Sequence, residues 1–305
     1  MQRKLLWILL LALYSCQGDD DLTDQPAESP FTLRSVDGRL KAPFGSIDYR
    51  VYYPEEWDQL THVIHVSRGG NGIGDDRGKL ANYVTAYVQA GYVVVQIDHR
   101  FAGGNIEKIA QFRGEEIQFF GSQVALGLLD YGDFRGTVDG SSQGFAGHSG
   151  GCMEGLMAAG TAMTHGNYAV PQIKAVYGMS PAGNHPDQFG IASNPSGYQE
   201  IGEAAIFVII GAEEKDVNGP GRFMAENWRL QPYEAMTNQG PRYQALVQGK
   251  NTDHMDIKGE NPDIEQYNRD NSLAFFDQFL RGKAISGPLG RISVPPSLDI
   301  DLSIK

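Results

Sequence analysis

The segment Gly147-His148-Ser149-Gly150-Gly151 constrains the fold of this chain more than any other feature of the sequence. The run that ends at His148 predicts a strand, and the residues from Gly151 onward predict a helix. Small residues two positions before and after Ser149 allow a sharp strand-to-helix turn without side-chain collision, as in the G-x-S-x-G nucleophile elbow. In a chain with 38 glycines the same pattern also arises as an ordinary turn, so its surroundings decide the interpretation.

Apolar runs recur on both sides of this segment, with helical stretches between them. Runs of this kind predict parallel strands that are buried on both faces of one sheet. Two earlier segments, 31–36 and 46–53, alternate polar and apolar residues and predict an antiparallel edge. The other expected strands are 62–67, 92–98, 143–148, 173–179, 205–211 and 243–248, and the expected helices are 81–90, 115–129, 151–157, 221–238 and 264–280.

Three segments, in this order, resemble the α/β-hydrolase superfamily: AGYVVVQIDHR at 90–100, GHSGG at 147–151 and HMD at 254–256. Within it they are most similar to platelet-activating-factor acetylhydrolases, dienelactone hydrolases and chlorophyllase-like esterases. The resemblance implies an α/β-hydrolase fold over residues 31–305, with a mostly parallel eight-stranded sheet, helices on both faces and a short cap. It also implies a serine hydrolase that cleaves carboxylic esters.

A serine at such a turn needs a general base, and the base needs an orienting carboxylate. In the hydrolases that the chain resembles, an acid and then a histidine follow the serine, each on a loop after a late strand. His254 is the only histidine after the acidic loop that follows 205–211. We therefore predict a triad of Ser149, Asp216 and His254, with Glu214 and then Glu213 as alternative acids.

Two backbone N–H groups are expected to form an oxyanion hole, which stabilises the charge that develops on a carbonyl oxygen. One belongs to Gly150, directly after the serine. The resemblance to the family's His-Gly-x loop places the other at Gly70. Arg68 stands where many relatives have histidine, and it either braces this loop through Asp75 or Asp76 or faces an anionic substrate group. No G-x-G-x-x-G or Walker lysine pattern supports a phosphate-binding interpretation of this loop.

The first thirty residues resemble a bacterial lipoprotein signal followed by a tether. Arg3 and Lys4 precede an apolar run at 5–13 that is too short to span a bilayer, and Cys16 follows it. The acidic stretch 17–21 is similar to the export signal of surface lipoproteins in the Bacteroidetes. A plain secretory peptide or a short membrane anchor is the alternative. We expect a signal peptide at 1–15, a lipidated Cys16 that begins an acidic tether ending at residue 30, a catalytic domain at 31–305, and a location in the bacterial outer membrane, exposed at the surface.

Charge and cysteine content narrow the possible partners. The net charge is −12, and loss of residues 1–15 changes it to −14, which argues against nucleic acid and anionic lipid surfaces as partners. The membrane is expected as a partner only through the lipid anchor. Cys152 has no pairing partner if Cys16 carries lipid, and a small buried role is expected for it. No residue cluster has metal-ligand spacing, and the proposed chemistry needs no metal or organic cofactor.

These observations predict a serine carboxylesterase that acts on small or medium acyl esters, such as acylated sugars. The loop Arg68-Gly69-Gly70 also resembles prolyl-oligopeptidase-like hydrolases, so a serine peptidase is one alternative. A hydrolase-fold surface binding protein without turnover is the other. Four aromatic residues on the two longest late loops either line the substrate pocket or pack in the core: Tyr198, Phe223, Trp228 and Tyr233.

Overall fold

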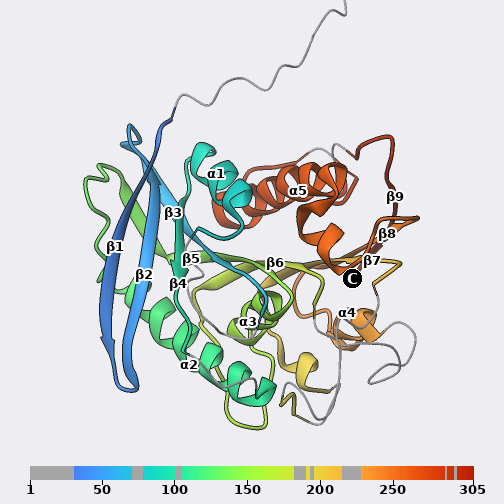
Figure 1. Ribbon diagram of the computed structural model, residues 1–305, viewed down its shortest axis with the longest axis horizontal. Coiled ribbons are helices and arrows are strands. Elements are labelled where there is room, and N and C mark those ends of the chain that lie inside the picture. The colour runs from blue at the N-terminus through green and yellow to red at the C-terminus, as the bar shows by residue number, and fades with distance from the viewer. Residues whose placement is uncertain are drawn as a thin grey trace, which may run out of the picture.

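The computed structural model describes residues 31–70, 78–100, 105–181, 190–192, 196–214, 228–285, 287–291 and 294–305. Within this part, the chain is an α/β protein built on one nine-stranded mixed sheet with helices on both faces (Figure 1). The expected signal peptide, Cys16 and the tether lie outside the described residues, as do Asp75, Asp76, Asp216, Phe223 and parts of the loops 181–203 and 217–239, which would form a cap.

The sheet order is β1-β2-β4-β3-β5-β6-β7-β8-β9. The six strands from β4 to β8 in this order run parallel, and three pairings at the edges, β1–β2, β2–β4 and β8–β9, are antiparallel. The parallel strands are apolar along most of their length because both of their faces are covered. The strands are β1 Leu33–Ala42, β2 Gly45–Pro54, β3 Leu60–Ser67, β4 Val93–Ile97, β5 Thr137–His148, β6 Ile173–Met179, β7 Ala205–Gly211, β8 Arg242–Gln248 and β9 Asp299–Ile304.

Helices α1 (Ala81–Gln89) and α5 (Pro262–Arg281) cover one face of the sheet, whereas α2 (Ile106–Ala125), α3 (Gly150–Ala158) and α4 (Gln231–Ala235) lie on the other (Figure 1). The first pair is joined by a hydrogen bond from Tyr87 Oη to Ser272 Oγ of 2.9 Å. Tyr87 and Phe276 also meet edge to face in the apolar core between these helices and the sheet. Short 3₁₀ turns occur at Ser196–Glu200 and Trp228–Leu230, and one π-helical turn at Asp256–Glu260.

The sheet has one strand more than the eight that the sequence predicted. The missed strand is β9, whose sequence Asp-Ile-Asp-Leu-Ser-Ile alternates polar and apolar residues as an edge strand does, and it pairs with β8. Helix α2 also begins at Ile106 rather than at residue 115. Asn105 caps it, because its side chain accepts the N–H of Lys108 at 2.9 Å. The predicted α/β class and mostly parallel sheet are confirmed.

Candidate active site

Ser149 occupies a sharp turn between β5 and α3. It has φ 56° and ψ −117°, a backbone conformation that costs a non-glycine residue about 1–3 kcal/mol. A β-carbon on Gly147 would lie 2.4 Å from the carbonyl carbon of Gly151, and one on Gly151 would lie 2.2 Å from the Ser67 carbonyl oxygen. Any side chain at either position would collide with backbone. The predicted strand-turn-helix geometry, with small residues two positions to each side of the serine, is confirmed.

The other candidate residues gather at the same edge of the sheet. Strands β3, β5, β6, β7 and β8 are parallel, so their carboxyl ends meet there, as in other open α/β sheets. Glu214 follows β7 and His254 follows β8. Glu214 Oε2 lies 3.1 Å from His254 Nδ1, and the two side chains are 1% and 9% exposed. A carboxylate at Nδ1 favours the tautomer in which Nδ1 carries the proton and Nε2 accepts one.

The acid that contacts the histidine is therefore Glu214, the second choice from the sequence. Glu213 points elsewhere, because its Oε2 accepts the N–H of Asn251 at 3.1 Å. Asp216, the first choice, lies outside the described residues. The sequence could not rank these three neighbouring carboxylates, because a shift of one residue on a loop turns a side chain to a different partner.

Two residues of this site were missed by the sequence analysis. Ser180 follows β6, has φ 53°, and places its Oγ 2.8 Å from His254 Nδ1 and in contact with Glu214 Oε2. Arg229 places its Nε 2.9 Å from the same Glu214 oxygen and donates from Nη1 to the Ser180 carbonyl oxygen at 3.1 Å. The position of Ser180 at a parallel strand end was a usable signal, whereas nothing in the sequence around Arg229 pointed to this contact.

The loop that carries His254 is held by the residue before the serine. His148 Nε2 donates to the His254 carbonyl oxygen at 2.9 Å, and the two rings lie 4.5 Å apart between centroids. Burial lowers the pKa of His148 well below its ordinary value, so this ring is neutral. No hydrogen bond joins Ser149 to His254 themselves, although both residues are described. Such contacts are often long in an unliganded site and tighten when substrate binds.

The expected oxyanion residues lie next to the serine. A β-carbon on Gly69 would lie 2.5 Å from Ser149 Cβ, and one on Gly150 would lie 3.9 Å from the Gly70 nitrogen. The loop after β3 thus passes close over the turn, and glycine is what permits this approach. Arg68 donates from Nη1 to the carbonyl oxygen of Gly69 at 3.2 Å, which braces the loop from within.

Cys152 and the candidate pocket aromatics belong to the core. Cys152 is fully buried on α3, where burial raises the pKa of its thiol, and a β-carbon on Gly178 would lie 2.3 Å from its sulfur. Its predicted role as a small buried residue is confirmed. Tyr198, Trp228 and Tyr233 pack with it in one apolar cluster, which favours the core-packing alternative for these three.

Comparisons with protein-family models and with curated proteins found no match. Among the residues that the structure describes, no group of three His, Cys, Asp or Glu side chains could hold a metal ion. No helix in the same part of the chain is both long and apolar enough to cross a membrane.

Proposed function

We propose that this chain is a serine carboxylesterase with an α/β-hydrolase fold. The observation that carries the proposal is the strained turn at Ser149, which lies at the same sheet edge as the Glu214–His254 pair. A positive φ at a non-glycine residue is retained where the surrounding structure over-determines it, and such strain clusters at active sites. The chain order of serine, acid and histidine, each after a parallel strand, also supports this fold.

In the proposed reaction, Ser149 Oγ attacks the ester carbonyl carbon while His254 Nε2 accepts the serine proton. The N–H groups of Gly70 and Gly150 stabilise the oxyanion, and Glu214 stabilises the imidazolium through Nδ1. Collapse of the tetrahedral intermediate breaks the bond to the alcohol, which leaves with the proton from His254. A water molecule then attacks the acyl-enzyme, gives its proton to His254, and releases the carboxylic acid as the proton returns to Ser149.

A cavity beside the oxyanion loop supports a small substrate with both polar and apolar parts. It has a volume of about 300 Å³, at the lower end for small-molecule sites. Its lining includes Arg68, Lys79 and Lys258, with Glu260 and Glu265 also present. Leu80, Ala81 and Tyr83 line the same cavity, so its wall offers apolar surface to an acyl chain as well as charged groups to a polar alcohol. We therefore favour small or medium acyl groups on polar alcohols, such as acylated sugars, presented to an enzyme tethered by lipid at the bacterial envelope.

The test is hydrolysis of p-nitrophenyl esters, from acetate to decanoate, by residues 17–305 and by its Ser149→Ala variant. The unmodified protein is expected to show a burst of p-nitrophenol followed by steady-state hydrolysis, fastest for short acyl chains. The variant is expected to show neither the burst nor the steady-state hydrolysis. Dipeptide anilides and a fluorophosphonate probe distinguish the alternatives. Faster cleavage of anilides than of esters would support a peptidase, and inertness to every substrate and to the probe would support a binding protein. Equal ester hydrolysis by both proteins would contradict the role of Ser149.

A further inference from the structure

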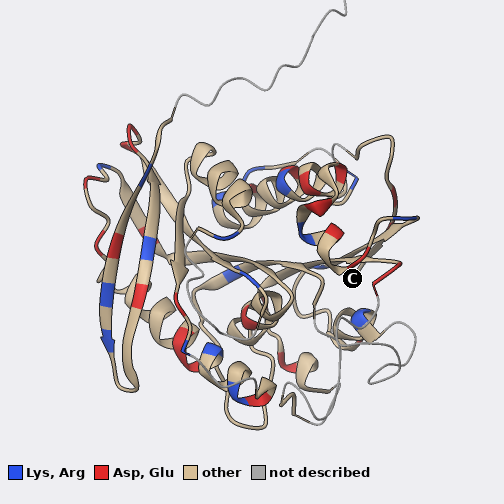
Figure 2. Ribbon diagram, viewed as in Figure 1, with Lys and Arg blue, Asp and Glu red and all other residues tan. Residues whose placement is uncertain are grey.

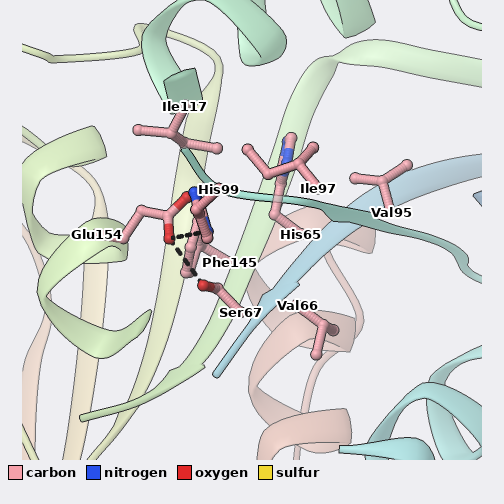
Figure 3. A pocket seen from close by; sticks show the side chains of 9 residues that line it. All are labelled: His65, Val66, Ser67, Val95, Ile97, His99, Ile117, Phe145 and Glu154. Atoms are coloured by element: carbon pink, nitrogen blue, oxygen red, sulfur yellow. Dashed lines mark hydrogen bonds and ion pairs between the residues drawn. The ribbon is translucent and has the colours of Figure 1, made fainter. Parts of the chain in front are cut away.

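A cluster of buried polar and charged side chains lies between β3, α2 and α3, and Figure 3 shows three of its members, Ser67, His99 and Glu154. We call it the buried ion cluster and define it as Ser67, His99, Arg113, Glu116 and Glu154. Each of these residues is at most 7% exposed. They come from the end of β3, the segment after β4, and helices α2 and α3, and three of them, Ser67, His99 and Glu154, border a cavity of about 10 Å³. The mechanism proposed above uses none of them.

Glu154 is the centre of the cluster. Its Oε2 accepts a hydrogen bond from Ser67 Oγ at 2.7 Å and another from Arg113 Nη1 at 2.9 Å, and His99 Nε2 lies 3.1 Å from the same oxygen. Arg113 Nη1 also donates to Ser67 Oγ at 2.9 Å. Figure 3 shows the Ser67 and His99 side chains pointing at this carboxylate. Removing one charge from such a group would leave the others buried without compensation.

His99 has a carboxylate at each ring nitrogen. Its Nδ1 lies 2.7 Å from Glu116 Oε2, opposite the Glu154 contact at Nε2. The two anionic oxygens, one hydrogen-bonded to Nδ1 and one 3.1 Å from Nε2, stabilise the positive charge of a doubly protonated imidazolium. Burial and the Arg113 charge lower the pKa of His99, but the two glutamates outweigh them and raise it to about 9.

The cluster joins the two chain segments that carry the candidate oxyanion donors. Ser67 is the last residue of β3, three positions before Gly70. Glu154 lies on α3, the helix that begins with Gly150. The hydrogen bond from Ser67 to Glu154 therefore fixes the loop after β3 relative to the helix after the serine. Oxyanion stabilisation depends on donors that are already in place when charge develops, so a small displacement of either segment would lower the rate.

We propose that the buried ion cluster positions the oxyanion donors, and that the imidazolium of His99 is the group that holds it together. This inference rests on the proposed function. Loss of the His99 proton would leave two glutamates facing a neutral ring, and the catalytic rate would then fall at alkaline pH through His99 rather than through the triad. Arg113 and Glu116 face His99 from α2 and Glu154 faces it from α3. Arg100, Glu115 and His65 complete the titratable surroundings.

The experiment compares Ser67→Ala and His99→Gln with the unmodified protein and with a matched control, His62→Gln. His62 is also a histidine beside a carboxylate, 3.5 Å from Asp139, but it lies on β3 five residues before Ser67. We measure kcat and KM for p-nitrophenyl acetate from pH 6 to pH 10, corrected for hydroxide-catalysed hydrolysis, and the rate of fluorophosphonate labelling. Near-ultraviolet circular dichroism verifies the fold of each protein before assay.

Ser67→Ala is expected to lower kcat on the order of 10-fold with KM changed by less than about 2-fold, because the donors are displaced while the binding surface stays. His99→Gln is expected to lower kcat similarly and to remove the decline of kcat/KM near pH 9. His62→Gln should have the kcat, KM and pH profile of the unmodified protein. If Ser67→Ala and His99→Gln keep the kcat and the pH profile of the unmodified protein, this inference is wrong while the proposed function stands. An unmodified protein that neither hydrolyses esters nor reacts with the probe would overturn the proposed function, and this inference with it.

Discussion

Two buried histidines, His99 and His254, each contact a buried glutamate, but the number of carboxylates around the ring differs. His99 meets carboxylates at both ring nitrogens, whereas His254 meets Glu214 at Nδ1 only. A ring held by anions on both sides keeps its two protons and acts as a fixed cation. A ring held on one side keeps a nitrogen that can accept and return a proton. The number of neighbouring carboxylates therefore separates His99 from His254, the general base that we propose.

The largest expected effect comes from the histidine with one carboxylate. His254→Gln should lower kcat for p-nitrophenyl acetate on the order of 10⁴–10⁶-fold, because no group remains to accept the serine proton. The midpoint of urea unfolding should change little, because glutamine keeps a polar side chain next to Glu214 and Ser180. Substantial activity in this variant would assign the base elsewhere.

The second expected effect identifies the acid. Glu214→Gln keeps the shape of the side chain but removes the charge that stabilises the imidazolium, and should lower kcat on the order of 10³–10⁴-fold. Glu213→Gln is the matched control and should change kcat little, because this carboxylate accepts from Asn251 instead. A larger loss in Asp216→Asn than in Glu214→Gln would show that the sequence had ranked the acids correctly and that our assignment is wrong.

The third prediction concerns the stability supplied by the buried ion cluster. Glu154→Gln should lower the free energy of unfolding by about 3–5 kcal/mol, because it leaves Arg113 and His99 buried without their shared anion. Urea denaturation followed by tryptophan fluorescence measures this change. A decrease in the free energy of unfolding below about 1 kcal/mol would mean that the cluster is hydrated or rearranged. His99 would then not act as a fixed cation that differs from His254.

The fourth prediction is a pH dependence of stability. Because the pKa of His99 is raised to about 9, the folded protein keeps this proton while the unfolded chain loses it near pH 6.5. The contribution of His99 is complete below pH 6.5 and is lost as pH rises to about 9, at a limiting slope of about 1.4 kcal/mol per pH unit. The free energy of unfolding is measured by urea denaturation across pH 6–10 for the unmodified protein and for His99→Gln, and the difference between them gives this slope. The same pH dependence in both proteins would contradict the prediction.

The smallest effect is expected at the exposed charges of β1 and β2, where Figure 2 shows both signs. Arg50 Nε donates to Asp37 Oδ1 at 2.8 Å across these two strands, but both side chains are well exposed, at 31% and 52%. Asp37→Asn should change the free energy of unfolding by about 0–1 kcal/mol, because water screens the pair. A decrease in the free energy of unfolding as large as that of Glu154→Gln would mean that exposed and buried ion pairs contribute equally to the stability of this protein.

Local pattern predicted most of the sheet and the turn at Ser149, because these depend on side-chain periodicity and on glycines at fixed spacing. The proximity of His254 to an acid was predicted from the chain order in the hydrolases that the sequence resembles. The identity of the acid, the contacts of Ser180 and Arg229, and the buried ion cluster depend on which side chains meet after the strands assemble. Glu154 illustrates the limit: it lies on a helix whose sequence predicts only burial, and its partners come from β3, α2 and the segment after β4.

The most direct test of the central claim is mass spectrometry of the protein after reaction with a fluorophosphonate probe. The account predicts one phosphonate adduct, located on Ser149 after proteolysis, with labelling abolished in Ser149→Ala and strongly slowed in His254→Gln. An adduct on a different residue, or no adduct in a correctly folded protein, would contradict the assignment of Ser149 as the nucleophile.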